Sequence, residues 1–459
     1  MIEEKGSFRD PAGKIFYKEN RVLRKITREG LKRIKFLNEN DIIAKSIEKK
    51  LLINTIEYKF WNENKINPES LIFEHSKIPF ISYPYEWSFS QLKAAAIHHL
   101  DFHLFLLELN ATLIDSSAFN IQFIGSKPIF IDLLSLKKYE EGEYWTGHKQ
   151  FCENFLNPLL LRSKKGINFN NWFKGNLEGI STSDLNQILS FFDKLSYNIF
   201  IQVYLLNKLE ERSKLKKNLN VNKKLKNKFP KKSFISMLKQ LRNFIYSLSP
   251  KKSFSYWDSY SDVNTYKKNE EITKIQCVEN FCKKYKFKTI ADLGCNDGFY
   301  SALALKNRCD YVVGFDYDLN SIEKAFQKSI REKLNFLPLY FDASNPSSNI
   351  GWNEKERKGF KDRAEFSGII ALAFEHHLAI AKNIPLEQVV EWLMNLAPRG
   401  LIEFVPKHDI TINKMLELKG DIFPNYNEDN FRKVISQKGK ILSTTKISES
   451  GRIIYEYER

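Results

Sequence analysis

Apolar and polar positions follow one pattern up to about residue 252 and a different one beyond it. Beyond residue 252, short apolar runs alternate with stretches of helical periodicity, which predicts parallel strands joined by helical crossovers. We expect helices between the first five strands. The predicted strands cover residues 288–293, 311–316, 336–341, 367–373, 400–405, 440–446 and 452–457.

The N-terminal part predicts short strands mixed with helices. An alternating run from Gly13 to Ile26, interrupted by a Lys-Glu-Asn turn, predicts a β-hairpin. Ser88 is the expected N-cap of a long amphipathic helix. Further strands are predicted at 71–74, 80–83, 121–124 and 128–131, and helices at 29–37, 41–60, 88–110 and most of the span from there to about 249.

Length and composition favour more than one domain. A chain of 459 residues with 42% hydrophobic and 28% charged positions has the composition of a globular protein and is long for a single core. We predict an α+β domain over 1–207, a basic helical segment or linker over 208–252, and an α/β domain over 253–459.

The net charge of +17 is concentrated in one segment. Between Lys208 and Lys252 there are 15 Lys and Arg residues and two acidic residues. Such a run predicts a solvated linker or helix face, and contact with an anionic surface such as lipid or acidic glycan is an alternative. A binding protein that uses this segment on nucleic acid is a further alternative, although nucleic acid is not the favoured partner.

The cysteines predict neither disulfides nor a metal site. Their number is odd and no paired CxxC or Cys/His spacing occurs, which favours a reducing cytoplasm. No run approaches the ~18 apolar residues of a membrane span, and residues 1–7 are polar, so we expect a protein that is neither exported nor integral. The five cysteines are Cys152, Cys277, Cys282, Cys295 and Cys309.

A glycine-containing loop joins the first strand of the α/β region to a helix. The strand at 289–293 leads into Gly294-Cys-Asn-Asp-Gly298, and the helix follows directly. Glycines at such a turn let the backbone approach a ligand, and the helix N-terminus presents free N–H groups to an anionic part of it. The loop alone is compatible with dinucleotides as well as with other cofactors.

Acidic residues end the first three predicted strands. Asp292 precedes the first glycine of the loop by two positions, Asp316 ends the second strand, and Asp342 follows the third. Because parallel strands end at one edge of a sheet, we expect the three carboxylates to line one crevice. The alternative is that they are capping and turn residues of an α/β domain.

These motifs resemble those of the class I S-adenosylmethionine-dependent methyltransferases, with Asn296 where a second glycine usually stands. The resemblance implies a Rossmann-like, seven-stranded domain that binds S-adenosylmethionine. It implies that Asp292 positions the methionyl ammonium, Asp316 the ribose hydroxyls and Asp342 the adenine amino group. The candidate cofactor-binding residues are Asp292, Gly294, Cys295, Asn296, Gly298, Asp316, Asp342, Ala343 and Ala373.

The fourth strand leads into Glu375, His376 and His377, which are the candidate catalytic residues. Methyl transfer is an in-line displacement, so a base is needed only if the acceptor must lose a proton, and a neutral histidine suits a hydroxyl or amine. The alternative is that these side chains only shape the pocket. Neither an Asp/Asn-Pro-Pro-Tyr/Phe motif nor a Pro-Cys follows this strand, which disfavours nucleobase and glutamine methylation.

Three charged residues after the fifth strand, Glu403, Lys407 and Asp409, are expected to face the acceptor unless they are ordinary loop charges. The strings at 345–347, 372–386 and 403–409 resemble the rhizobial nodulation NoeA-type methyltransferases, and the resemblance covers most of the chain. It implies methyl transfer to oxygen or nitrogen of a saccharide or small metabolite, with a place in surface-glycan biosynthesis.

The N-terminal half contains a second candidate site. Asp115, Asn120 and Asp132 have a spacing that resembles the catalytic loop and metal site of protein-kinase-like folds, which implies Asp115 as base and Asn120 and Asp132 as magnesium ligands. A glycine-rich phosphate loop is missing, and only Arg24 or Lys25 could replace the usual lysine. Three alternatives stay open: Mg-nucleotide phosphotransfer in a bifunctional kinase-methyltransferase, a degenerate substrate-binding module, or a chance match.

Overall fold

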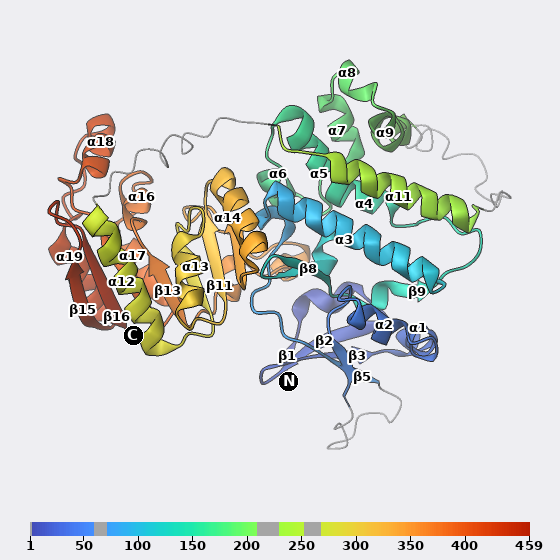
Figure 1. The fold of residues 1–459 in the computed structure, drawn as a ribbon, viewed down its shortest axis with the longest axis horizontal. Helices are drawn as coiled ribbons and strands as arrows, with labels where there is room; N and C mark the ends of the chain where they lie inside the picture. The colour runs from blue at the N-terminus through green and yellow to red at the C-terminus, as the bar shows by residue number, and fades with distance from the viewer. Residues whose placement is uncertain (1, 59–70, 209–228, 252–267) are drawn as a thin grey trace. The chain divides into compact units, whose positions relative to one another are not determined.

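The computed structural model of the chain describes residues 2–58, 71–208, 229–251 and 268–459. The chain forms two compact units (Figure 1). Unit 1 comprises Met1–Phe123, Lys127–Ser253 and Ile350–Arg357, and unit 2 comprises Ile124–Ser126, Phe254–Asn349 and Lys358–Arg459. Among the residues described, no helix has both the length and the apolar character to cross a membrane.

Unit 1 begins with an antiparallel five-stranded sheet of order β1-β2-β3-β5-β4. The predicted hairpin is confirmed, since β2 and β3 pair from Gly13 and Ile26 to Lys18 and Arg21 around a turn in which Glu19 has a φ of 53°. Its elements are β1 (Ile2–Glu3), η1 (Lys5–Arg9), β2 (Gly13–Lys18), β3 (Arg21–Ile26), α1 (Arg28–Glu39), α2 (Ile42–Glu48), β4 (Thr55–Glu57) and β5 (Ile72–His75).

Two predictions in this region are wrong. The helix predicted over 41–60 ends at Glu48, because the chain turns through Lys50 at a φ of 57° and then forms strand β4; residues 59 and 60 lie outside the described residues. The strand predicted at 80–83 does not form. The side-chain amide of Gln122 instead bonds the N–H and the carbonyl of Ser82, each at 2.9 Å, and so replaces a neighbouring strand.

The remainder of unit 1 is mainly helical and is built around α3 (Phe89–Glu108). Ser88 is its N-cap as predicted, and the Ser88 hydroxyl and the Gln91 side chain form a capping box. The other elements are η2 (Pro84–Glu86), β6 (Ala111–Leu113), η3 (Ala118–Asn120), β7 (Ile121–Ile124), β8 (Lys127–Phe130), η4 (Leu133–Ser135), β9 (Leu136–Lys138), α4 (His148–Phe151), η5 (Cys152–Leu156), α5 (Asn157–Leu160), η6 (Leu161–Lys165), α6 (Asn170–Gly175), α7 (Thr182–Ile188), α8 (Phe191–Lys194), α9 (Tyr197–Ile199) and η7 (Phe200–Leu205).

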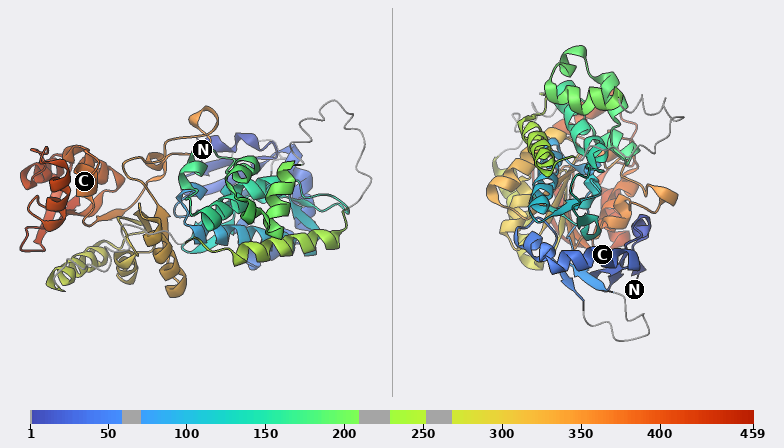
Figure 2. Two further views of the ribbon diagram at one scale, coloured as in Figure 1. Left: turned by 90° about the horizontal axis from the view of Figure 1, so that it is seen from above. Right: turned by 90° about the vertical axis from the view of Figure 1, so that its right-hand side faces the viewer.

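The described end of the basic segment belongs to unit 1 and is not a linker. Helix α11 (Lys231–Ser247) runs alongside α3, as two views show (Figure 1, Figure 2). It buries Phe234, Leu238, Leu241 and Ile245 on one face, and Arg242 pairs with Asp101 of α3. The rest of the predicted segment, residues 209–228, lies outside the described residues. The charge of α11 therefore sits on the solvent face of an amphipathic, packed helix.

Unit 2 contains a seven-stranded sheet of order β12-β11-β10-β13-β14-β16-β15. The first five strands along the chain are parallel, and β16 runs antiparallel between β14 and β15. Every strand lies within two residues of its predicted position at each end. The strands are β10 (Ile290–Leu293), β11 (Val312–Asp316), β12 (Phe336–Tyr340), β13 (Gly368–Ala371), β14 (Arg399–Phe404), β15 (Lys440–Lys446) and β16 (Ile453–Glu458).

Helices cover both faces of this sheet (Figure 1), with α12 against α13 and α17 against α19. The core contains Ile290, Val312, Phe336, Ile370 and Leu401 from five different strands. This is the crossover arrangement that the alternating pattern predicts. The helices are α12 (Lys268–Tyr285), α13 (Phe299–Lys306), α14 (Leu319–Glu332), α15 (Phe360–Arg363), α16 (Glu375–Ala379), α17 (Leu386–Leu396), α18 (Ile410–Lys419) and α19 (Glu428–Lys438), and the short η8 (Trp352–Glu354) falls in unit 1.

Candidate functional site

The glycine loop lies between the carboxyl end of β10 and the N-terminus of α13. Gly294 and Gly298 have φ angles of +76° and +81°, and Gly298 is the N-cap of α13. A Cβ at Gly298 would lie 2.4 Å from the ring of Phe336. Both positions therefore require glycine. The loop places the N-terminus of α13 at the edge of the sheet, where the helix dipole favours an anionic group.

Asp292 is a buried carboxylate with no cationic partner among the described residues. Its side chain accepts a hydrogen bond of 2.6 Å from the Ser301 hydroxyl of α13. Burial is the main cause that raises the pKa of Asp292 to about 7, and the nearby Asp316 charge adds to it. A ligand cation at this carboxylate would restore its ordinary ionisation.

Asp316, at the end of β11, accepts hydrogen bonds from the glycine loop. The backbone N–H of Asn296 bonds its Oδ2 at 2.9 Å, and that of Asp318 bonds its Oδ1 at 2.8 Å. Burial raises the pKa of Asp316. Asn296 has a φ of 48°, a left-handed conformation that asparagine tolerates better than most residues. This conformation explains why asparagine can stand where the resembled motif has glycine.

Two further predicted cofactor residues follow β12. Asp342 is half-buried, and Ser344 bonds its Oδ1 through the backbone N–H at 2.9 Å and the hydroxyl at 2.6 Å. Ala343 beside it is also half-buried. Since the side-chain hydrogen bonds of Asp342 with described residues fall on one oxygen, the other can accept from a ligand.

Cys295 is placed differently from the other loop residues. Its side chain is buried in the core of unit 2, and a Cβ at Gly314 would lie 2.8 Å from its Sγ. Burial raises the pKa of this thiol well above its ordinary value. Cys295 therefore has only backbone atoms to offer a ligand.

Sequence reasoning missed three aromatic residues near the loop. Phe374 lies against Gly294, since a Cβ there would be 3.2 Å from its ring. Trp392 of α17 lies between Phe374 and Phe341, with ring centroids 6.5 and 6.4 Å away and interplanar angles of 24° and 10°. Phe341 and Phe374 directly precede predicted site residues, whereas Trp392 carries no sequence signal. Together these three rings form an aromatic wall.

The predicted catalytic residues differ strongly in their surroundings. Glu375 is fully buried and accepts the Val405 N–H at 3.0 Å, and the Tyr426 hydroxyl lies 2.9 Å from the same oxygen. His376 is also buried, and its Nδ1 lies 3.4 Å from Glu375. Ala373 turns the chain into this segment at a φ of 50°. Glu375 thus links the segment after β13 to the residue after β14 and to Tyr426.

His377 is the most exposed of the three candidates. It is half-buried, and its ring centroid lies 4.2 Å from that of His376. Burial, followed by the neighbouring His376, lowers the pKa of His377 well below its ordinary value. The imidazole is therefore neutral at pH 7 and has one ring nitrogen that can accept a hydrogen bond.

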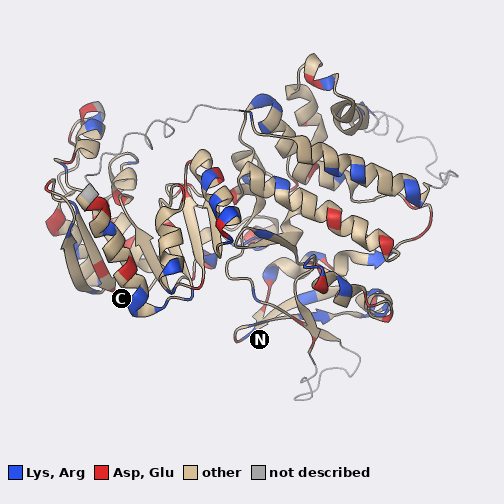
Figure 3. Ribbon diagram, in the orientation of Figure 1, with Lys and Arg blue, Asp and Glu red and all other residues tan. Residues whose placement is uncertain are grey.

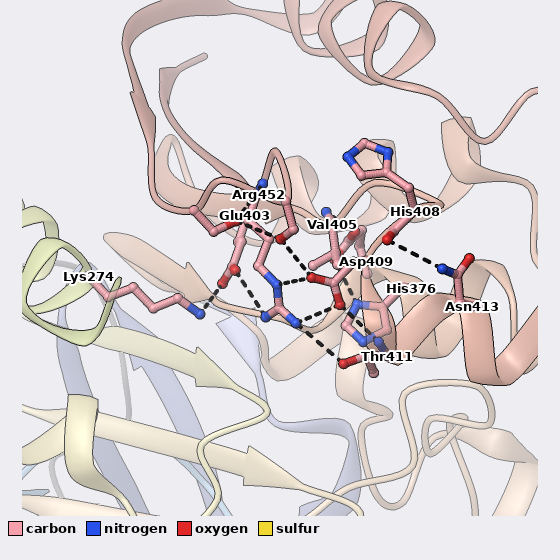
Figure 4. Close-up of polar contacts among 12 residues, drawn as sticks. Lys274, His376, Glu403, Val405, His408, Asp409, Thr411, Asn413 and Arg452 are labelled. Atoms are coloured by element: carbon pink, nitrogen blue, oxygen red, sulfur yellow. Dashed lines mark hydrogen bonds and ion pairs between the residues drawn. The ribbon is translucent and has the colours of Figure 1, made fainter. Parts of the chain in front are cut away.

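Two of the three charged residues predicted to face the acceptor, Glu403 and Asp409, belong to a buried network (Figure 4). Glu403 is fully buried and pairs with Lys274 of α12 at 2.8 Å, and Arg452 lies 3.6 Å from its other oxygen. Arg452 also pairs with Asp409 at 2.7 Å. The prediction that Glu403 and Asp409 face an acceptor is therefore wrong. Lys407 pairs with Asp421 at 2.7 Å.

In unit 1, Asp132 is neutralised by the protein itself. Arg24 of β3 bonds Asp132 at 2.7 Å, and its Nε donates to Nε2 of His75 at 3.3 Å. Burial lowers the pKa of His75 to about 3, so this imidazole is neutral and can accept. Asp10 lies 4.0 Å from the same guanidinium. Of the two basic residues considered from the sequence, Arg24 and not Lys25 points to the acidic site.

Asn120 and Asp115 are the other two predicted residues of this second site. Asn120 donates to Ser135 at 3.5 Å, and the Ser135 hydroxyl donates to Asp132. Asp115 accepts the backbone N–H of Ser117 at 2.9 Å. Asn120 and Asp132 are thus brought together through Ser135, while Asp115 caps its own turn. Among the residues the structure describes, no group of three His, Cys, Asp or Glu side chains could hold a metal ion.

Comparison with known proteins gives one sequence relative over the full length. The nodulation protein NoeA of Rhizobium meliloti is 41% identical over 457 residues, which cover 99% of this chain and 95% of the relative. No protein-family model matches the chain.

Two solved structures each resemble less than half of the chain. Magnesium protoporphyrin IX methyltransferase from Synechocystis, with bound S-adenosylhomocysteine, is 16% identical with a TM-score of 0.29 and covers 49% of this chain and 94% of its own. The N-methyltransferase NodS from Bradyrhizobium japonicum is 8% identical with a TM-score of 0.31 and covers 42% of this chain and 97% of its own.

Proposed function

This chain belongs to the family of the nodulation protein NoeA, and we propose that its residues 253–459 form an S-adenosylmethionine-dependent methyltransferase. The observation that carries the proposal is Asp292, a buried carboxylate without a cation among the described residues. It lies beside a left-handed glycine loop at a helix N-terminus and on the strand next to Asp316. An amino acid joined to a nucleoside offers an ammonium for Asp292, a carboxylate for the helix N-terminus and ribose hydroxyls for Asp316.

The residues at the sheet edge fit the parts of this cofactor one by one. Asp292 suits the ammonium of the methionyl part, and the N–H groups that begin α13 suit its carboxylate. Asp316 can accept from two ribose hydroxyls, and Asp342 from the adenine amino group. The aromatic wall supplies an apolar face for the base. When bound, S-adenosylmethionine supplies a methyl group on an electrophilic sulfonium.

The acceptor side is formed by the segment after β13. We propose that His377, neutral at pH 7, removes or orients the acceptor proton, and that Glu375 and His376 hold this segment in place. The acceptor is a hydroxyl or amine of a saccharide or small metabolite, within surface-glycan biosynthesis. Mass spectrometry of surface glycans and metabolites with and without the gene should reveal a product that differs by one methyl group. The absence of any such difference would contradict this acceptor class.

The donor site is tested by titration calorimetry of the full chain with S-adenosylhomocysteine. We expect binding that Asp316→Ala weakens about a hundredfold, because two hydrogen bonds to a charged group are lost. Asp310→Ala is the matched control, since Asp310 is exposed and precedes the opposite, amino end of the same strand. No binding, or equal loss in both variants, would remove the cofactor assignment.

For unit 1 we propose a kinase-like fold that contributes to acceptor binding without Mg-nucleotide. The Arg24 guanidinium at 2.7 Å from Asp132 favours this over phosphotransfer, because it supplies the positive charge that a metal ion would bring to this carboxylate. Calorimetry with Mg-ATP should show no binding to the full chain. Mg-dependent nucleotide binding that Asp132→Ala abolishes would instead support the bifunctional enzyme.

A further inference from the structure

Unit 1 exposes large apolar side chains on α8, on α9, in the turn between these helices and at the start of η7. Phe191 and Phe192 of α8 are 73% and 80% exposed, and Leu195 and Tyr197 are each 64% exposed. Phe200, which begins η7, is 43% exposed. We call these five residues the aromatic patch. Contiguous apolar surface of this kind is uncommon on soluble proteins and marks an interaction site.

The basic face of α11 lies beside the aromatic patch. The side-chain amide of Gln240 on α11 donates to Asn198 of α9 at 3.2 Å. Lys232 and Lys239 are exposed and seven residues apart, so they share one helix face. Helix α11 has four basic and no acidic residues. Figure 3 shows blue but no red segments along it. The exposed surface next to the aromatic patch is therefore positively charged.

Acidic side chains do little to neutralise this surface. Asp193, between the two phenylalanines and Leu195, pairs with Lys165 at 2.6 Å. Lys194 follows it in α8. Lys208 lies over the ring of Tyr204 at 5.6 Å. The aromatic patch thus has a lysine next to it in α8, and its own acid is already paired.

A cavity of about 620 Å³ lies between η7 and α11. Apolar side chains dominate its lining, among them Ile201, Leu205, Leu206 and Met237, and Lys232 contributes a cation. A cavity with an apolar lining and one ammonium suits an amphiphile with an anionic head. It extends the apolar surface of the aromatic patch toward the basic helix.

We propose that this face of unit 1 docks on an anionic lipid bilayer. The aromatic patch enters the interfacial region, and Lys232 and Lys239 contact the headgroups. A second copy of the chain fits less well, since a symmetric contact would bring the two basic faces together. Nucleic acid offers phosphates for the lysines but no apolar layer for Phe191, Phe192 and Leu195.

The test is co-sedimentation of the full chain with vesicles of phosphatidylcholine alone or mixed with phosphatidylglycerol. We expect binding only where phosphatidylglycerol is present. Phe191→Ser with Phe192→Ser should weaken it at least about tenfold, because two large apolar side chains leave the interface. Lys232→Gln with Lys239→Gln should also weaken it about tenfold and reduce its salt dependence.

Matched controls separate docking from general charge and hydrophobicity. Ile56→Ser removes an apolar side chain that is 56% exposed elsewhere in unit 1, and Lys35→Gln with Lys138→Gln removes the same charge from other exposed positions. Both should bind vesicles as the unchanged protein does. Equal loss in controls and test variants, no vesicle binding, self-association through the aromatic patch, or a polynucleotide as the preferred ligand would each overturn the proposal.

Discussion

Each unit contains a buried or half-buried carboxylate at its candidate site. One carboxylate has a cationic partner within the protein, and the other has none among the described residues. In unit 1, Asp132 has its counter-charge within the protein, at 2.7 Å from Arg24. In unit 2, Asp292 accepts a hydrogen bond from the Ser301 hydroxyl but has no cation among the described residues, and burial raises its pKa to about 7. A carboxylate that the fold has neutralised is complete without a ligand. One that the fold leaves without a cation indicates where a ligand cation belongs.

The largest expected effect comes from breaking the completed pair. Arg24→Met should lower the free energy of unfolding of unit 1 by about 2 to 3 kcal/mol, because it leaves Asp132 without a cation and His75 without a donor. This loss is smaller than the roughly 3 to 5 kcal/mol of a fully buried ion pair, because the Asp132 side chain is 20% exposed. Urea unfolding of the full chain measures the change.

The control for this prediction lies on the same strand. Arg21 pairs with Glu74 at 3.6 Å, and its side chain is 48% exposed, so Arg21→Met should change stability by less than about 0.5 kcal/mol. Adding Asp132→Leu to Arg24→Met should recover part of the loss, because the unpaired charge is removed. If Arg24→Met were as stable as Arg21→Met, the pair would contribute nothing and the contrast between the units would fail.

The next effect tests the carboxylate that has no cation. Asp292→Asn should weaken S-adenosylhomocysteine binding about thirtyfold, since the ligand ammonium loses its charged partner. The same change should leave the ligand-free protein at least as stable at pH 8, because asparagine avoids burying a charge. Calorimetry and urea unfolding of one variant give both numbers.

Asp310→Asn, at an exposed position, is the control and should change neither affinity nor stability. Loss of stability without loss of affinity in Asp292→Asn would assign Asp292 to the fold and not to a ligand. Asp292 and Asp132 would then both be structural carboxylates, and the proposed difference between the two units would be wrong.

Most of unit 2 could be predicted from the sequence, because its strands are encoded by local runs of apolar residues. Every strand followed from an apolar run between turn residues, and the placement of Asp292, Asp316 and Asp342 at adjacent strand ends followed from parallel order. Sequence reasoning could not anticipate Trp392, which meets Phe374 only through the packing of α17. It also misjudged Glu403, because the burying partner Lys274 lies more than a hundred residues away.

Unit 1 was predicted less well for a related physical reason. The β2–β3 hairpin depends on local alternation, and it was found where expected. The chain at 80–83 instead satisfies its backbone through the Gln122 side chain, which no periodicity reveals. For the basic segment the sequence left a linker and a helix face open, and the contact between α11 and α3 favours the helix face for the part that the structure describes.

The smallest expected effect is the part of the pH dependence of stability that Asp292 contributes. The pKa of Asp292 is raised in the fold, so its protonated form is favoured there, and stability falls as pH rises through about 7. Between pH 6 and pH 8 the ligand-free protein should lose about 1 kcal/mol from this group. Urea unfolding at the two pH values measures it, and Asp292→Asn should remove this contribution. Because a ligand cation stabilises the ionised carboxylate, saturating S-adenosylhomocysteine should also flatten the dependence. If the slope were the same in Asp292→Asn as in the unchanged protein, the charge of Asp292 would be compensated within unit 2 as that of Asp132 is in unit 1.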